Sequence, residues 1–138
     1  MPNGIELILA DHRAVEALFE MFDETGTGAV IGQVMDMLTA HDDAEQGALY
    51  PFASATLGAD AVLERLLVAH TALAQQMDQV KALEGVSLLD SFGVLRRLVE
   101  DHVKDEEQNL LPALGEKATA AELDTLGSRI LQAKQRGG

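Results

Sequence analysis

The four histidines are the side chains of this sequence best suited to bind a metal ion, because the chain contains no cysteine. A single histidine on the apolar face of a helix is usually a hydrogen-bonded core residue. Here each histidine falls on the apolar stripe of a different predicted helix: His12, His41, His70 and His102. Apolar residues precede each of them by three and four positions, as Leu66 and Leu67 precede His70. Four inward-facing imidazoles predict one shared metal site.

Two glutamates occupy matching positions. Glu45 follows His41 by four residues, and Glu106 follows His102 by four residues. Residues at this spacing share one face of a helix, so both carboxylates are expected to point inward. A buried carboxylate without a partner is unfavourable by several kcal/mol, and a cation is its natural partner. The neighbouring acids are interpreted as solvated or salt-bridged surface residues: Asp42, Asp43 and Asp105.

Helical periodicity explains how these side chains are positioned. Apolar residues at 3.6-residue spacing, interrupted by glycine-containing breaks, predict four long helices and a shorter fifth. Their ranges are about 4–24, 29–51, 59–83, 88–111 and 120–134. Pro51 is expected to end or kink the second helix, and Pro112 to end the fourth. Short loops make neighbours antiparallel, so residues 1–138 are expected to form one all-α domain, an up-down-up-down four-helix bundle with a short fifth C-terminal helix.

Counting residues from the loops indicates that the histidines are level. At a rise of about 1.5 Å per residue, His12 and His41 each lie roughly 20 Å from the loop between them. His70 and His102 lie roughly 23–26 Å from the loop between the third and fourth helices. The two pairs meet near Pro51, where an early helix end is expected to absorb a mismatch of several residues. We therefore expect all four imidazoles in one layer of the core.

The pattern H…HxxxE…H…HxxxE, spread over four helices, resembles that of the hemerythrin-like (HHE cation-binding) proteins of the bacterial single-domain type. The stretches ADHRAVEALFEMF, HDDAEQGALYP and DHVKDEEQNLLPAL carry the likeness, which covers nearly the whole chain. The resemblance implies a non-haem centre of two iron ions with carboxylate or oxo bridges. By position, His12 and His41 would hold one iron, His70 and His102 the other, and Glu45 and Glu106 would bridge them. Zinc or manganese also suits these groups.

The sequence departs from the oxygen-carrying hemerythrins at one ligand. Those proteins have a second histidine one turn after the third-helix histidine, where this chain has Ala74. The missing ligand leaves a position for water, for an open site or for another side chain. Tyr50 is one candidate, although regular helix geometry turns it away from His41 unless the helix breaks locally. Glu16, one turn after His12, is another, and Glu107 is a substitute bridge, since a carboxylate five residues after the histidine also occurs in this family.

An incomplete ligand set favours reaction with small oxidants, because it leaves coordination positions open. The resemblance then implies reaction with peroxide, dioxygen or nitric oxide, including catalase-like breakdown of hydrogen peroxide. In that case the di-iron centre itself is the reactive group, with Tyr50 as the accompanying candidate. The alternative is a module that binds or stores oxygen or iron, or senses them, without turnover, so the sequence alone does not decide whether the chain is an enzyme.

Charge and composition limit the partners. The 23 acidic and 10 basic residues give a net charge of −13, which repels nucleic acid and anionic lipid. Neither nucleic acid nor a membrane is therefore expected as a partner. No apolar run approaches the roughly 20 residues of a membrane span, and no basic segment precedes an apolar run at the N-terminus. A cytoplasmic monomer or weak homo-oligomer acting on small molecules is expected.

Overall fold

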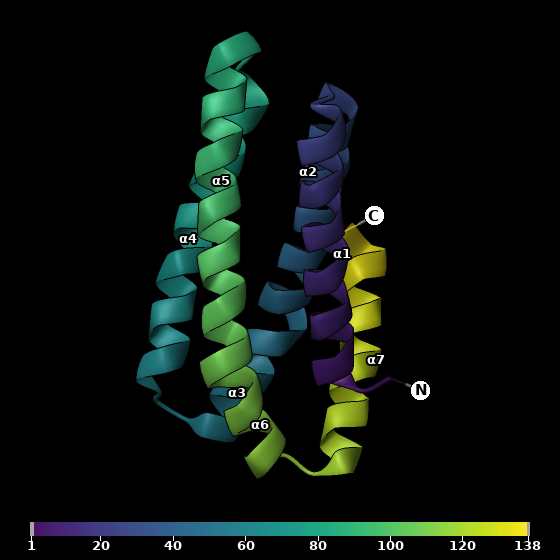
Figure 1. Ribbon diagram of the computed structural model, residues 1–138. Helices are drawn as coiled ribbons and strands as arrows, with labels where there is room; N and C mark the ends of the chain where they lie inside the picture. Colours follow the sequence, from purple (N-terminus) through teal and green to yellow (C-terminus); the bar gives the residue numbers. More distant parts are fainter. Residues whose placement is uncertain (1, 138) are drawn as a thin grey trace.

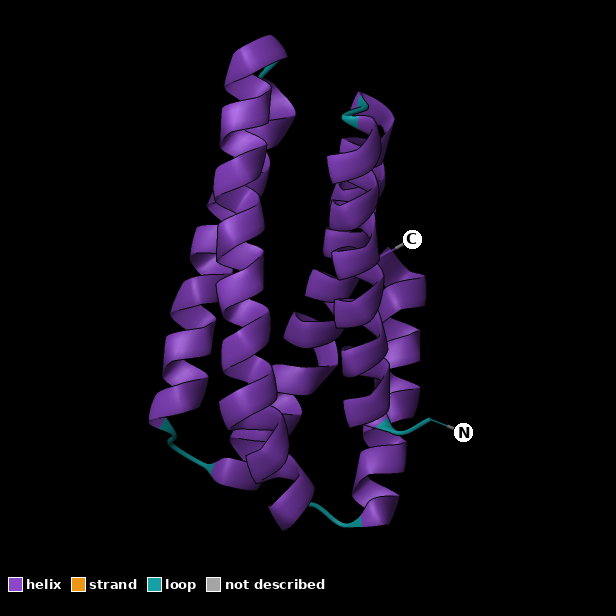
Figure 2. Cartoon of the chain, viewed as in Figure 1, coloured by secondary structure: helices purple, strands orange, loops and turns teal. Residues whose placement is uncertain are grey.

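Two helical hairpins, α1–α2 and α4–α5, stand side by side and are connected at the lower end of the molecule (Figure 1). The computed structural model describes residues 2–137, and every regular element in that range is a helix (Figure 2). The α-helices are α1 (Gly4–Thr25), α2 (Gly28–Ala44), α3 (Tyr50–Leu57), α4 (Ala61–Ala82), α5 (Gly85–Asp105), α6 (Leu111–Lys117) and α7 (Ala120–Gly137). The predicted all-α, up-down-up-down arrangement is confirmed.

Local hydrogen bonds set where the helices begin. The Asn3 side chain accepts the Glu6 N–H at 2.9 Å, and the Glu6 carboxylate accepts the Asn3 N–H at 3.0 Å, which forms a capping box before α1. The Asp60 carboxylate caps α4, so this helix begins at Ala61 and not at residue 59 as predicted. The fourth predicted helix begins earlier than residue 88: Gly85, with a left-handed φ of 63°, is the first residue of α5.

Two one-turn π-helical segments interrupt the long helices: η1 (Glu45–Leu49) and η2 (Glu106–Leu110). Each begins at a glutamate of the HxxxE pattern and is followed directly by a helical turn that contains proline. The residue after each segment donates its N–H to the glutamate carbonyl five positions back. In a regular α-helix a proline ring clashes with the carbonyl four residues before it. The wider π turn lets the chain pass Pro51 and Pro112 without that clash.

Pro51 was expected to end or kink the second helix and Pro112 to end the fourth, but helical structure continues past both prolines. After Pro51 the chain continues as α3 to Leu57, and after Pro112 it continues as α6 to Lys117. Both prolines stand at the first turn of the new α-helical segment, where a missing N–H is tolerated. As a result α3 and α6 close the lower end of the bundle (Figure 1).

Buried apolar side chains form two separate clusters. The upper cluster lies toward the tips of the two hairpins and comprises Val15, Phe19, Val30, Ile31, Val34, Met35, Leu38, Leu73, Val80, Phe92, Leu95 and Val99. The lower cluster lies toward α3 and α6 and comprises Ile8, Ala44, Ala48, Leu49, Tyr50, Ala53, Leu63, Leu66, Leu110, Leu111, Leu114, Leu126 and Ile130. A layer of buried histidine and glutamate side chains falls between the two clusters along each helix.

The C-terminal helix α7 packs against α1, α2 and η1 on the outside of the first hairpin (Figure 1). It is the predicted fifth helix, spans 18 residues and extends beyond the predicted end at residue 134. The contact is close enough to require glycine at the start of α1. A Cβ on Gly4 would lie 2.4 Å from the Leu126 side chain, and a Cβ on Gly127 would lie 3.0 Å from the Pro2 carbonyl oxygen.

Candidate metal centre

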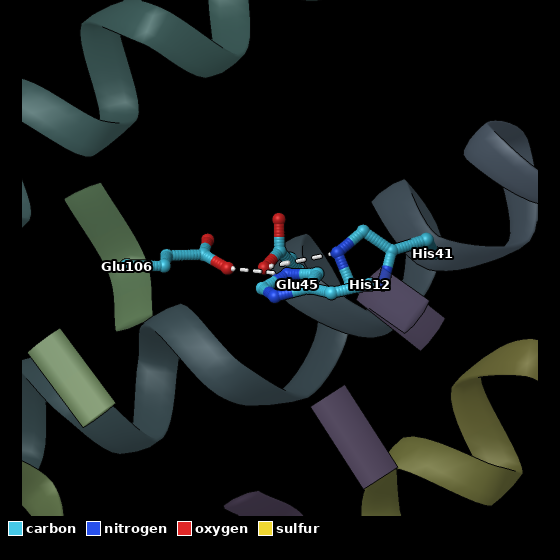
Figure 3. A group of neighbouring side chains, drawn as sticks. All are labelled: His12, His41, Glu45 and Glu106. Carbon is cyan, nitrogen blue, oxygen red and sulfur yellow. Dashed lines mark ion pairs between the residues drawn. The ribbon is translucent and has the colours of Figure 1, made fainter. Parts of the chain in front are cut away.

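Six side chains from α1, α2, η1, α4, α5 and η2 converge between the two clusters. His12, His41, Glu45 and Glu106 each offer a ligand atom within 4.8 Å of the others (Figure 3). Glu45, His70 and His102 form a second group of the same kind. All six residues of the predicted ligand set therefore lie in one place, and Glu45 belongs to both groups.

Each carboxylate contacts histidines of both hairpins. Glu45 Oε2 lies 3.2 Å from His41 Nε2, while Glu45 Oε1 lies 3.0 Å from His70 Nε2 and 3.3 Å from His102 Nε2. Glu106 Oε1 lies 3.1 Å from His12 Nε2, and Glu106 Oε2 lies 2.9 Å from His102 Nε2. One oxygen of each glutamate thus faces the His12–His41 side, and the other faces the His70–His102 side.

Several of these atoms lack the hydrogen bonds that burial demands. His12 Nε2, His41 Nε2, Glu45 Oε2 and Glu106 Oε1 are buried and have no hydrogen-bond partner in the part of the chain that the structure describes. An unsatisfied buried polar group costs about 1–3 kcal/mol, and more when it is charged. A cation among these atoms would satisfy all four, so the residues fit a metal ion.

The outer nitrogens of three histidine rings are held by polar side chains. His12 Nδ1 lies 2.7 Å from Glu107, His41 Nδ1 lies 2.8 Å from Asp11, and His70 Nδ1 lies 2.6 Å from Asp42. The Gln46 side chain also lies 2.9 Å from His70 Nδ1. When Nδ1–H donates to a carboxylate, the Nε2 lone pair is left for a metal, which is the usual arrangement around metal-bound histidine.

These outer carboxylates follow one rule. Each is the sequence neighbour of a central residue, and each holds a histidine on the next helix around the bundle. Asp11 precedes His12 on α1 and binds His41 on α2; Asp42 follows His41 and binds His70 on α4. Glu107 follows Glu106 in η2 and binds His12 on α1. Neighbouring positions on a helix point about 100° apart, so a residue beside an inward ligand faces the adjacent helix.

His102 is the one central histidine without such a carboxylate among the described residues. The His102 Nδ1 atom is buried and has no hydrogen-bond partner among the described residues. By the same rule, the carboxylate for His102 on α5 would come from α4, where the sequence neighbours of His70 are Ala69 and Thr71. Ala69 directly precedes His70 on α4, as Asp11 directly precedes His12 on α1. Its methyl group cannot accept a hydrogen bond from the His102 imidazole.

The π turn in η1 brings Tyr50 to the centre. In a regular α-helix Tyr50 would point about 140° away from Glu45, but a π turn is bonded at five-residue spacing and returns it to the same side. The Tyr50 hydroxyl donates to Glu106 Oε2 at 2.7 Å, and it also lies 2.9 Å from His102 Nε2 and 3.2 Å from Glu45 Oε1. Burial, then the charges of Glu45 and Glu106, raise the pKa of this phenol.

The other two suggested ligands lie outside the centre. Glu16 is 41% exposed and forms an ion pair with Arg13 at 3.0 Å, so the structure does not bring it to the site. Glu107 contacts the outer nitrogen of His12, pairs with Arg13, and does not replace Glu106 as a bridge.

A cavity of about 30 Å³ adjoins the centre on its upper side. The histidines, Asp11, Asp42 and Glu45 form its polar side, and its apolar lining consists of Val15, Met37, Leu38, Leu73, Met77, Val99 and Val103. Ala74 is exposed and does not line this cavity; on α4 that role falls to Leu73 and Met77. Tyr50 belongs to the lower cluster, so its hydroxyl approaches the centre from the side opposite the cavity.

The hemerythrin HHE cation-binding domain model matches residues 3–114 of the chain. The chain belongs to this family. The resemblance inferred from the sequence is confirmed, and the family description makes the site a cation-binding site.

Two relatives extend the comparison. A crystal structure of a hemerythrin HHE cation-binding domain-containing protein from Mycobacterium kansasii has a TM-score of 0.83 and 21% sequence identity to this chain. The match covers 99% of this chain and 88% of that one, and at this identity it shows the shared fold. A protein from Nostoc sp. described as a DNA nickase is 26% identical over 140 residues, 97% of this chain. This chain spans 40% of the length of that relative.

Electrostatics explain how the HHE centre binds protons. Burial alone would lower the pKa of His41, but Glu45 and Asp11 outweigh it and raise that pKa to about 10. At His102, Glu106 and Glu45 outweigh burial and raise the pKa to about 10. Burial would raise the pKa of Glu45, but the charge of His41 and the hydrogen bonds with Glu106, His102 and His41 bring it well below its ordinary value. A metal ion must displace these protons, since it needs neutral imidazole nitrogens.

Some residues that hold the HHE centre were missed from the sequence. Asp42, interpreted as a surface acid, binds His70, and Asp11 was not singled out although it binds His41. Adjacent acid–histidine pairs were the available signal: Asp11 beside His12 in DH and Asp42 beside His41 in HD. Asp105 does form the expected salt bridge, with Arg65 at 2.6 Å.

Among residues 2–137, none of the helices combines the length and apolar character that a membrane span requires.

Proposed function

We propose that this chain holds two iron ions and breaks down hydrogen peroxide. His12 and His41 would hold one iron, His70 and His102 the other, with Glu45 and Glu106 bridging. The observation that carries the proposal is the pair of ligand groups that share Glu45 beside a small cavity. A bound iron pair supplies a two-electron redox couple, which matches the disproportionation of two peroxide molecules into dioxygen and two waters.

The residues of the chain restrict what reaches the centre. A water molecule needs about 10–15 Å³ of such space, and the proposed ions would take part of the 30 Å³ cavity because the four histidines and Glu45 line it, so only very small molecules fit beside them. Hydrogen peroxide, dioxygen and nitric oxide fit this limit, whereas a bulky organic hydroperoxide does not. The upper walls of the cavity are apolar side chains, which offer no hydrogen bonds to water.

Tyr50 closes the opposite side. Its hydroxyl contacts Glu106, Glu45 and His102, and so it lies beside the His70–His102 group on the side away from Ala74. We propose that it completes the ligand set there. The raised pKa keeps the phenol protonated until a cation is bound, because two carboxylates surround it.

Iron content and peroxide turnover test the proposal. Protein produced with ample iron is expected to contain about two irons per chain, to release dioxygen from hydrogen peroxide, and to leave tert-butyl hydroperoxide almost untouched. The metal-free protein is the control and should release none. One iron or less per chain, or zinc alone after such growth, would refute the di-iron proposal; inert iron-loaded protein would refute the peroxide activity.

The alternative is a carrier, store or sensor without turnover. The apolar walls favour it for uncharged dioxygen or nitric oxide, which need no proton transfer on binding. Reversible spectral change with either gas, in protein that leaves peroxide intact, would establish this alternative. In both cases we propose that the partners are small molecules, because a net charge of −13 disfavours nucleic acid, and that the chain acts in the cytoplasm as a monomer or weak homo-oligomer.

A further inference from the structure

The C-terminal helix reaches the metal centre through a chain of three charged groups. Lys134 Nζ on α7 lies 2.5 Å from Asp11 Oδ1 on α1. The other oxygen of the same carboxylate, Asp11 Oδ2, lies 2.8 Å from His41 Nδ1 on α2. His41 Nε2 in turn faces Glu45 at the centre. A residue more than 90 positions from His41 therefore contacts the group that orients its ring.

Close helix packing fixes the position of Lys134. Gly4 and Gly127 let α1 and α7 approach closely, and Ala133 lies within 3.3 Å of where a Cβ on Gly47 would be. The lysine side chain is 26% exposed, whereas that of Asp11 is only 9% exposed. The ammonium group thus lies at the edge of a buried carboxylate that would otherwise have one oxygen without a charged partner. This helix also lies beyond residues 3–114, which match the family model.

Among the residues that the structure describes, cations support one of the two ligand groups in this way. Arg13 binds Glu107, which holds His12, and Lys134 binds Asp11, which holds His41. In the other group Asp42 holds His70 and is 38% exposed, while His102 Nδ1 has no partner among the described residues. The His12–His41 group is therefore the more firmly held of the two.

We propose that Lys134 is a positioning residue of the metal centre, which fixes Asp11 and through it the His41 ring. This inference rests on the proposed pair of metal ions. It makes α7 part of the site, although α7 contributes no ligand. Losing an outer partner of a metal-bound histidine commonly weakens binding by about 10–100-fold, so the effect is large enough to measure.

Release of iron to a chelator from the full iron-loaded chain tests the role of Lys134. In Lys134→Met, one of the two ions is expected to leave about tenfold faster, and the other at the wild-type rate. Lys134→Arg should restore slow release, because it keeps the cation. Asp11→Asn should accelerate the same ion, and Lys134→Met should add nothing further in that background. Arg129→Met is the matched control, because Arg129 is an exposed cation on α7 and has no contact with Asp11.

Each result has one meaning. Equal acceleration of both ions in Lys134→Met would overturn the inference, since a loosened α7 would explain it. Release at the wild-type rate would overturn it as well. Circular dichroism and thermal unfolding of each metal-free variant check that the helices remain folded. If the wild-type chain itself binds fewer than two ions, the proposed di-iron function fails before Lys134 is tested.

Discussion

Asp42 Oδ1 lies 2.6 Å from His70 Nδ1, so an acid beside a ligand of one hairpin orients a ligand of the other hairpin. Asp11 and Glu107 make the corresponding contacts to His41 and His12. Three of the four histidines are thereby held by a carboxylate at Nδ1. The arrangement leaves His102 as the exception, and it indicates where a fourth carboxylate would have to stand.

Ala69→Asp is expected to supply that carboxylate. Its side chain would face α5 and accept the His102 Nδ1–H, because it takes the place on α4 that Asp11 takes on α1. Gaining an outer partner should slow iron release from the His70–His102 group by about tenfold. Thr71→Asp adds the same charge on the other side of His70 and should not slow release. Equal release from both variants would show that position 69 does not reach His102.

Removing a central histidine should remove metal. His41→Ala and His102→Ala are each expected to lower iron content by more than half, measured by elemental analysis. Both should also lower the melting temperature of the loaded protein, since a metal bound only by the folded chain stabilises it. Asp43→Ala is the control, because Asp43 is not among the residues of the centre. Full iron content in either histidine variant would contradict the proposed ligand set.

Tyr50→Phe should separate the phenol from the rest of the centre. If the phenolate binds ferric iron, the oxidised wild-type protein shows an intense visible charge-transfer band, and the variant lacks it while keeping most of its iron. We expect this outcome because the hydroxyl lies within 2.7–3.2 Å of Glu106, His102 and Glu45. Identical spectra would instead assign Tyr50 to hydrogen bonding alone.

The stability of the metal-free protein should fall as pH rises above neutrality. The pKa values of His41 and His102 are raised to about 10 and that of His70 to about 9, against about 6.5 in an unfolded chain. Their stabilising contribution is therefore fully present below about pH 6.5 and is lost as pH rises through 9–10. The lowered pKa of Glu45 acts oppositely and costs stability as pH falls below about 4.3.

Urea denaturation at a series of pH values measures this dependence. The metal-free midpoint is expected to be highest at roughly pH 5–6.5, between those two limits. Iron-loaded protein should resist the alkaline loss, because metal takes the place of the protons. His70→Gln should make the alkaline slope shallower. A metal-free midpoint that stays level or rises between neutral and alkaline pH would contradict the raised histidine pKa values.

The ligand layer could be predicted from sequence because its signals are local. His12, His41, His70 and His102 each lie on a helical apolar stripe, and the HxxxE spacing places Glu45 and Glu106 beside two of them. The π turns could not be predicted, because they depend both on the steric clash of each proline ring and on the packing of side chains at the centre. Without them Tyr50 points away and the helices appear to end at the prolines.

Contacts between distant segments could not be predicted from the sequence either. Lys134 looks like an ordinary surface residue of a terminal helix, and only the packing of Gly4 against Leu126 shows why it lies near Asp11. Ala74 was interpreted as the place of a missing ligand, yet it is exposed, because small rotations of α4 decide whether residue 73 or 74 faces the cavity. Periodicity alone does not resolve such rotations.

The two carboxylates that cross between the hairpins have a consequence for how the molecule comes apart. Each hairpin contributes both histidines of one ligand group, so each can close on contacts that are local in sequence, which is a fast step in folding. Glu45 and Glu106 then contact histidines of both hairpins, and the proposed metal ions would bind the two hairpins together. Removing the metal should therefore weaken the contact between the two hairpins while each hairpin stays folded. Amide hydrogen exchange would then report two cooperative units of different stability where the loaded protein behaves as one.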